Sequence, residues 1–304
     1  MKNRKVRQAI IFMHGMGNQG PNYSKNTGDL ILQELTKSGV ASNILTRIIF
    51  KEFLCSNLLS KKETELWNRL ERGNAKSQIG KKMDYHKLRE FFIMFIGDSL
   101  LFNQPSIWTE IDDILSRLIT EIKNEAEQDD SDFELTFIAH SLGTILLSEY
   151  LKTVTTNKEH SLNKIITEQN VMNIFTLGSP LAIWSLKNGS VANAKPQIFK
   201  NPKNGVWVNI LDDDDIIGYP LKPINKSYDE IIDIDYVTEI GNFLQPSVLF
   251  SHSGYWKDLN VIKPIAKKLE LDICREENGE QFNSTEYEAF IKSLAKEKWT
   301  QFFR

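Results

Sequence analysis

Cysteine is nearly absent from this sequence: only Cys55 and Cys274 occur among 304 residues, and they lie far apart. Two such distant cysteines form neither a disulfide framework nor the clustered spacing of a metal site. Long apolar runs are also absent, since none approaches the roughly 20 residues needed to cross a bilayer. The apolar stretch after the basic N-terminus, residues 9–13, is too short for a signal peptide. We therefore expect a soluble, reduced, cytoplasmic protein without a transmembrane segment.

The charge balance lacks the excess of one sign that nucleic-acid binding requires. The formal net charge is -3, and charged residues make up 25% of the chain. Apolar residues make up 41%, which is ordinary for a globular protein. A chain of this length can bury about three quarters of the surface that it exposes when unfolded. The composition therefore predicts a globular protein with one sizeable core and no nucleic-acid partner.

The order of apolar patterns predicts a mostly parallel central sheet flanked by helices. Short apolar runs rich in β-branched residues are expected to be buried strands, at residues 9–13, 44–50, 133–139, 171–177 and 206–211. Helical spacing separates most of them, at residues 23–38, 109–123 and 143–154, and continues from residue 264 to the end. Strands that alternate with helices are typical of the α/β class.

Residues 51–97 interrupt this alternation. The stretch is charged, polar around residues 73–82 and rich in aromatic residues near its end. We interpret it as a partly helical insertion, a lid, within a single domain that spans residues 1–304, because strand patterns continue on both sides. The aromatic-rich residues 85–102 are expected to form a lid or an acyl-binding wall, or else ordinary core.

The strongest chemical signal is Ala139-His-Ser-Leu-Gly143, which lies between an expected strand and an expected helix. A serine at a sharp strand-to-helix turn needs small residues two positions before and after it, because larger side chains would clash there. Ala139 and Gly143 meet that need. The turn would present the Ser141 hydroxyl above a helix N-terminus, where the backbone N–H of Leu142 can stabilise a developing oxyanion. Ser141 is therefore the candidate nucleophile.

A second glycine-containing turn, His14-Gly-Met-Gly17, follows the first expected strand directly. An oxyanion hole usually needs a second backbone N–H from such a loop, and Met16 would supply it. His14, Gly15 and Gly17 would then line the substrate. The alternatives are a plain loop or a phosphate-binding turn. A dinucleotide fingerprint would need a helix that opens at once after the glycines, and the next expected helix starts only at residue 23.

A nucleophilic serine needs a histidine base, and five histidines are present. His14 and His140 belong to the two turns already described. His86 and His160 lie in charged stretches where exposed side chains are expected. His252, in the segment Leu249-Phe-Ser-His-Ser-Gly-Tyr-Trp256, follows the last plausible strand and is the candidate base. A buried structural histidine is the alternative for this residue.

The acid that orients the histidine should follow a strand between Ser141 and His252. Residues 206–211 run straight into four aspartates, Asp212 to Asp215, and then into Ile216-Ile217. Asp215 is nearest to the apolar residues that would turn it inward, and Asp214 is its main competitor. Four adjacent carboxylates could instead bind a hard cation such as calcium or magnesium, although we expect no metal site.

These motifs together resemble α/β-hydrolase lipases, and more narrowly the intracellular phospholipase A1 group that carries the DDHD domain. The resemblance covers residues 8–256 in patches. It includes Gly97-Asp-Ser-Leu-Leu-Phe-Asn103 before the elbow, Gly178-Ser-Pro180, and Asp215-Ile-Ile-Gly-Tyr-Pro-Leu-Lys-Pro-Ile224. In that last segment Tyr219, Leu221 and Pro223 match the family's frame, which favours Asp215 over Asp214. The resemblance implies the α/β-hydrolase fold and a lipid ester as substrate.

The expected chemistry is ester hydrolysis through an acyl-enzyme, with Ser141, His252 and Asp215 as the triad and Met16 and Leu142 as the oxyanion hole. No cofactor is required. The expected partner is a small-molecule or lipid ester, which is compatible with contact at a membrane surface. The same triad could serve a thioesterase or an acyltransferase. A binding module with an idle triad is a further alternative, which a His252 pointing away from Ser141 would favour. The oligomeric state is left open.

Overall fold

The computed structural model describes residues 5–15, 19–55, 64–70, 93, 96–97, 104–166, 170–196, 204–240 and 252–301, and only the backbone of residues 188 and 295–301. Six strands form one sheet in the order β2-β1-β3-β4-β5-β6, and every neighbouring pair is parallel. Their bounds are β1 (Lys5–Met13), β2 (Ile49–Phe53), β3 (Ser131–His140), β4 (Val171–Leu177), β5 (Val206–Leu211) and β6 (Ile234–Val237). The expected parallel α/β sheet is confirmed.

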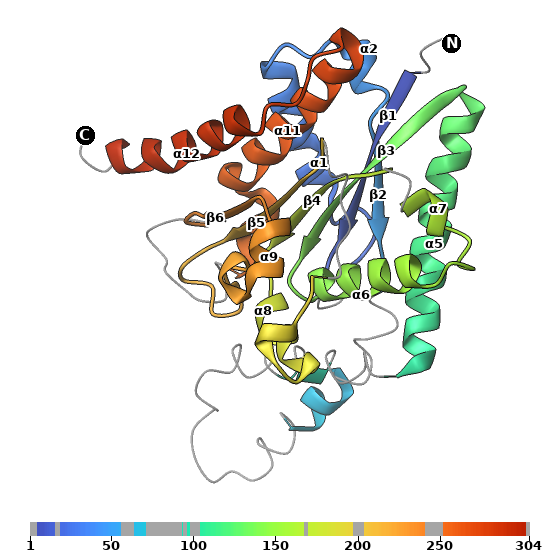
Figure 1. The fold of residues 1–304 in the computed structure, drawn as a ribbon, viewed down its shortest axis with the longest axis vertical. Helices are drawn as coiled ribbons and strands as arrows, with labels where there is room; N and C mark the ends of the chain where they lie inside the picture. Colours follow the sequence, from blue (N-terminus) through green and yellow to red (C-terminus); the bar gives the residue numbers. More distant parts are fainter. Residues whose placement is uncertain are drawn as a thin grey trace.

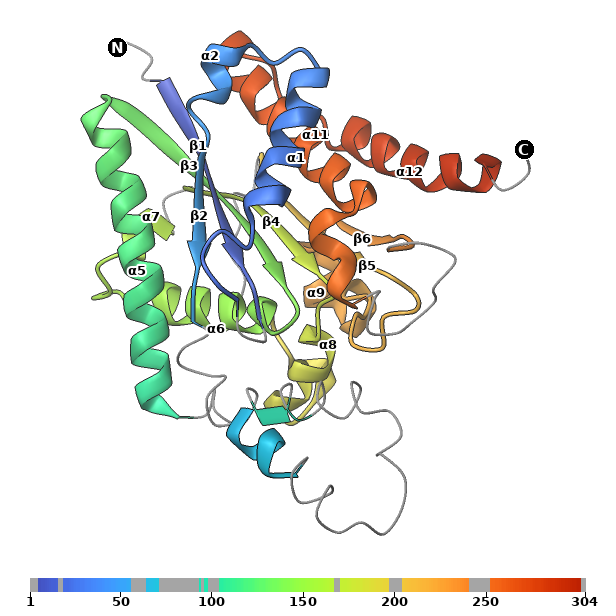
Figure 2. The same cartoon turned by 180° about the vertical axis from the view of Figure 1, so that it is seen from behind.

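Helices cover both faces of this sheet (Figures 1 and 2). One face carries α5 (Pro105–Gln128) and α6 (Leu142–Thr156), and the other carries α1 (Lys25–Lys37) and α11 (Leu259–Asn278). The final helix, α12 (Ser284–Gln301), packs on α11. Short helices include α2 (Ser42–Leu45), α7 (Asn163–Ile165), α8 (Leu181–Trp184) and α9 (Lys226–Ile231). Single-turn 3-10 helices are η2 (Ser185–Asn188), η3 (Val191–Asn193), η4 (Lys222–Ile224) and η5 (Tyr255–Lys257).

Strand β1 shows how the sequence specifies this layering. Successive strand side chains point to opposite faces, so Ala9, Ile11 and Met13 join the core beneath α5 and α6. Ile10 and Phe12 join the core beneath α1 and α11. All five are fully buried, which explains why the run is continuously apolar rather than alternating.

The connections between the strands determine where on the sheet a ligand-binding site can lie. From β1 the chain passes through α1 to β2 on one side, whereas β3 lies on the other side of β1 and is followed by α6 on the opposite face. The loops that leave β1 and β3 therefore diverge at a topological switch point, where ligands of open α/β sheets bind beyond the carboxyl ends of the strands. Met13 pairs with Ala139, so His14-Gly15 and Ser141 emerge side by side.

Two elements differ from the sequence expectation. Residues 44–50 were expected to be one strand, but α2 takes residues 42–45 and β2 starts only at Ile49. Ile44 and Leu45 pack on the sheet face instead of within the sheet, and a short apolar run does not distinguish these outcomes. The edge strand β6 was missed because it contains Asp235, a residue type depleted in strands. Asp235 accepts hydrogen bonds from the backbone N–H groups of Leu221 and Lys222.

The expected insertion at residues 51–97 starts later than predicted, because residues 51–53 belong to β2. Most of its other residues lie outside the described ones, so the lid stays a prediction. Within it, residues 64–70 form a helix with Trp67 buried. No helix among the described residues is long and apolar enough to cross a membrane.

Candidate active site

Ser141 lies at the turn where β3 ends and α6 begins. Its backbone has φ 57° and ψ -131°, in the left-handed half of conformational space that a residue with a side chain rarely adopts. The Ser141 N–H donates to the carbonyl of Leu177 at 2.9 Å, which ties the turn to the neighbouring strand β4. Such strain persists only where the surroundings enforce it and clusters at functional sites. This is the geometry expected of a nucleophile elbow.

Two glycines allow the loop after β1 to contact this elbow. A Cβ atom added to Gly143 would lie 2.6 Å from the carbonyl oxygen of Met13. A Cβ added to Gly15 would lie 2.3 Å from the backbone nitrogens of both Leu142 and Gly143. These nitrogens belong to the first turn of α6, where backbone N–H groups have no partner within the helix. Gly15 therefore keeps the space in front of the candidate oxyanion donor open.

We expect Gly15→Ala to lower the free energy of unfolding by about 3 kcal/mol, because the added methyl group meets main-chain atoms that cannot rotate away. Gly20→Ala is the matched control, since no atom lies within 4 Å of a Cβ at Gly20. The control should stay within about 0.5 kcal/mol of the wild type. Urea unfolding curves measure both. Equal stability of the two variants would show that residue 15 does not contact the α6 N-terminus.

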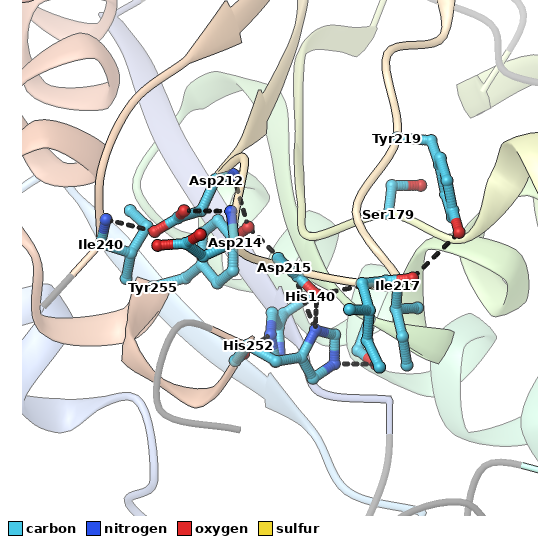
Figure 3. Close-up of polar contacts among 12 residues, drawn as sticks. His140, Ser179, Asp212, Asp214, Asp215, Ile217, Tyr219, Ile240, His252 and Tyr255 are labelled. Atoms are coloured by element: carbon cyan, nitrogen blue, oxygen red, sulfur yellow. Dashed lines mark hydrogen bonds and ion pairs between the residues drawn. The ribbon is translucent and has the colours of Figure 1, made fainter. Parts of the chain in front are cut away.

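The structure brings Ser141, His252 and Asp215 together in one series of hydrogen bonds. Figure 3 shows the His252 and Asp215 side chains in contact. His252 Nε2 lies 2.7 Å from Ser141 Oγ. His252 Nδ1 lies 3.0 Å and 2.9 Å from the two carboxylate oxygens of Asp215. All three residues are buried. Because a carboxylate only accepts, Nδ1 carries the proton toward Asp215 and Nε2 is left to accept one from Ser141.

The Asp215 carboxylate is held by further donors. The N–H of Ile217 donates to Oδ1 at 3.0 Å, and the Tyr255 hydroxyl donates to Oδ2 at 2.9 Å. Burial raises the pKa of the Asp215 carboxyl, but the hydrogen bond and charge of His252, with these two donors, outweigh burial and hold the pKa below its ordinary value. Asp215 is therefore ionised at neutral pH.

The loop after β4 supports the same groups. Gly178 has φ +51°, and a Cβ there would lie 2.6 Å from Asp215 Oδ2. Ser179 donates to the Thr144 hydroxyl at 2.9 Å, and Thr144 donates to the carbonyl of Ser141 at 2.8 Å. Gly178 thus leaves room for the carboxylate, and Ser179 braces the elbow through Thr144.

The structure describes some of the other residues that the sequence placed at the site and leaves others outside the described residues. Met16 and Gly17 lie outside the described residues, so Met16 as an oxyanion donor and Gly17 as a substrate contact stay predictions. His14 stacks on Trp256 with ring centroids 6.0 Å apart. Asp214 is exposed and points its side chain away from this chain of contacts, as Figure 3 shows. His160, expected to be exposed, is instead largely buried and lies 3.1 Å from Asp112.

The four consecutive aspartates divide their roles. Asp212 is buried and accepts from the N–H groups of Asp214 and Ile240, whereas Asp213 and Asp214 are exposed. Within the part of the chain that the structure describes, no group of three or more His, Cys, Asp or Glu side chains is placed to hold a metal ion.

Sequence reasoning missed Tyr255 as a member of this site. Its hydroxyl accepts from the Asp212 N–H at 3.0 Å while it donates to Asp215. Burial and then the Asp215 carboxylate raise the pKa of Tyr255, so the hydroxyl keeps its proton. The available signal was its spacing: Tyr255 follows His252 by three residues, and residues 252–257 are helical, so both side chains lie on one face.

The fold, a six-stranded parallel sheet with helices on both faces, is consistent with that of the α/β hydrolases. Residues 75–206, which include the elbow, match the model of a family described as "Putative serine esterase (DUF676)". No curated protein matches the chain. Among solved structures, it is similar to phospholipase PlaB from Legionella pneumophila in complex with thio-NAD, with a TM-score of 0.31 and 10% identity over 67% of this chain. The match spans 38% of the phospholipase chain, and at this similarity it says nothing about substrate.

Proposed function

We propose that this protein is a serine hydrolase that cleaves carboxylic esters through an acyl-enzyme. The observation that carries the proposal is the buried hydrogen-bonded chain from Ser141 through His252 to Asp215, with Ser141 held in a strained elbow. The match of residues 75–206 to a serine esterase family supports the same chemistry. The arrangement also argues against an idle binding module, because His252 faces Ser141 at 2.7 Å.

The reaction follows from which atoms can donate and accept. Ser141 Oγ attacks the ester carbonyl while its proton passes to His252 Nε2, and the resulting imidazolium is stabilised by ionised Asp215. Collapse of the tetrahedral intermediate breaks the ester C–O bond, and the alcohol leaves with the proton from Nε2. Water then attacks the acyl-enzyme by the same route and releases the carboxylic acid. The Leu142 N–H, at the start of α6, would donate to the oxyanion, and the Met16 N–H is proposed as the second donor.

A long-chain acyl substrate, such as a lipid or phospholipid, is the substrate class that we propose. Large apolar side chains are exposed on two segments that follow β4 and β5: Ile183 and Leu186 on one, and Ile216 and Tyr219 on the other. The N–H of Tyr219 donates to the carbonyl of Ser179 at 3.3 Å, so the two segments adjoin beside Asp215. Exposed apolar groups that gather near a site are typical of binding surfaces for apolar ligands.

The experiment that tests this function is labelling with a fluorophosphonate probe, followed by peptide mapping and a p-nitrophenyl ester series from acetyl to palmitoyl. We expect one label, on Ser141, and a kcat/KM that rises with acyl length. Absence of labelling on folded protein would contradict the hydrolase. Labelling with full activity only on the acetyl ester would leave the hydrolase standing and reject the long-chain substrate.

A further inference from the structure

A second histidine, His140, lies against His252 at the end of β3. It is buried, and its ring centroid lies 4.8 Å from that of His252. The rings of His14, Tyr255 and Trp256 lie within 5.7 Å of His140 and enclose it further. Figure 3 shows the His140 ring beside the imidazole of His252. Its position next to Ser141 in the sequence places it at the centre of the site, although the reaction above does not use it.

The hydrogen bonding of His140 is directed at the backbone of His252. Its Nε2 lies 2.6 Å from the His252 carbonyl oxygen. A carbonyl oxygen only accepts, so Nε2 carries the proton and donates it. Nδ1 has no hydrogen-bond partner among the described residues. Burial, and then the neighbouring His252 and His14, lower the pKa of His140 well below its ordinary value. The His140 ring is therefore neutral, with its proton on Nε2 and its one hydrogen bond to the His252 carbonyl oxygen.

We propose that His140 is a positioning residue that fixes the main chain of His252 so that the imidazole faces Ser141. The inference rests on the proposed function. The geometry is a closed loop: His140 Nε2 donates to the backbone of His252, and the His252 side chain returns to Ser141, the next residue along the chain. Two adjacent residues at the end of β3 thus hold His252 at both ends: His140 holds its main chain, and Ser141 contacts its reactive nitrogen, Nε2.

The neutral state of His140 also suits this positioning role. A positive charge on a ring whose centroid lies 4.8 Å from that of His252 would disfavour the imidazolium that His252 forms during the reaction. A histidine kept neutral by burial donates the hydrogen bond without that penalty. A lysine or arginine could reach the same carbonyl only with a charge attached.

The test compares three substitutions at this position. In His140→Gln the side-chain amide nitrogen can reach the place of Nε2, in His140→Asn the shorter amide reaches only the place of Nδ1, and His140→Leu keeps bulk without a donor. We expect His140→Leu and His140→Asn to lower kcat about 10²-fold, the cost of a displacement of about 1 Å at a reacting group. KM should change little, and His140→Gln should recover most of the loss.

The readouts are kcat and KM for a p-nitrophenyl ester, the rate of fluorophosphonate labelling, and urea unfolding of each variant. Recovery by Gln but not by Asn supports the proposal, since both carry the same uncharged amide and differ in how far it reaches. Equal kcat in all three variants and wild type would overturn it, as would equal loss in Gln and Asn. A wild type that is not labelled would instead refute the proposed function, so the two failures are distinguishable.

Discussion

Replacing Ser141 by alanine is expected to lower kcat for ester hydrolysis by about 10⁶-fold, the loss seen when a triad serine is removed. Alanine keeps the backbone and removes only Oγ, the atom that lies 2.7 Å from His252 Nε2. Initial rates on a p-nitrophenyl ester and the stoichiometry of fluorophosphonate labelling measure the loss. Circular dichroism should show an unchanged fold. A variant that keeps even a tenth of the activity would mean that the nucleophile is another residue.

Ser141→Gly is the matched variant that separates chemistry from strain. Both variants lack the hydroxyl, but only glycine adopts φ 57° without steric cost. Relief of about 1–3 kcal/mol of strain, less about 0.4–1 kcal/mol for the greater freedom of glycine in the unfolded chain, should make the glycine variant more stable. We expect its free energy of unfolding to exceed that of Ser141→Ala by about 1 kcal/mol. Equal or lower stability would show that the elbow stores no strain.

The elbow could be predicted from the sequence because its requirements are local. Ala139 and Gly143 have to be small on steric grounds, and a strand and a helix have to flank Ser141. The structure adds the reason for Gly143 in particular, the carbonyl of Met13 at 2.6 Å from its missing Cβ. That contact joins the end of β1 to the first turn of α6, two elements far apart in the sequence, so no local pattern could have revealed it.

His252 and Asp215 were reached by elimination and by resemblance, and the roles of Tyr255 and His140 were not reached at all. The latter two act through contacts across the fold: Tyr255 bridges Asp212 and Asp215, and His140 donates to a backbone carbonyl 112 positions away. Backbone acceptors carry no sequence signal, because every residue has one. Similarly, edge strand β6 was missed because the hydrogen bonds that Asp235 accepts are visible only once the strands are assembled.

Asp215 and Asp214 are the two candidates for the carboxylate that orients His252. Asp215→Asn is expected to lower kcat by about 10⁴-fold. An asparagine amide would donate to His252 Nδ1 and so move the imidazole proton to Nε2, where it blocks transfer from Ser141. In the wild type, the donors Ile217 and Tyr255 contact separate carboxylate oxygens of Asp215. The asparagine amide has only one oxygen to accept from both. The loss should therefore fall on kcat, with KM nearly unchanged.

Asp214→Asn is the matched control, because it makes the same change one residue earlier on an exposed side chain. The contact of Asp214 within the loop runs through its backbone N–H to Asp212, which the substitution preserves. We expect kcat within about twofold of wild type and a free energy of unfolding within about 0.5 kcal/mol. Steady-state kinetics on both variants decide the assignment. If Asp214→Asn lost activity while Asp215→Asn kept it, the carboxylate that orients His252 would have been misassigned, and the buried position of Asp215 would then need a purely structural explanation.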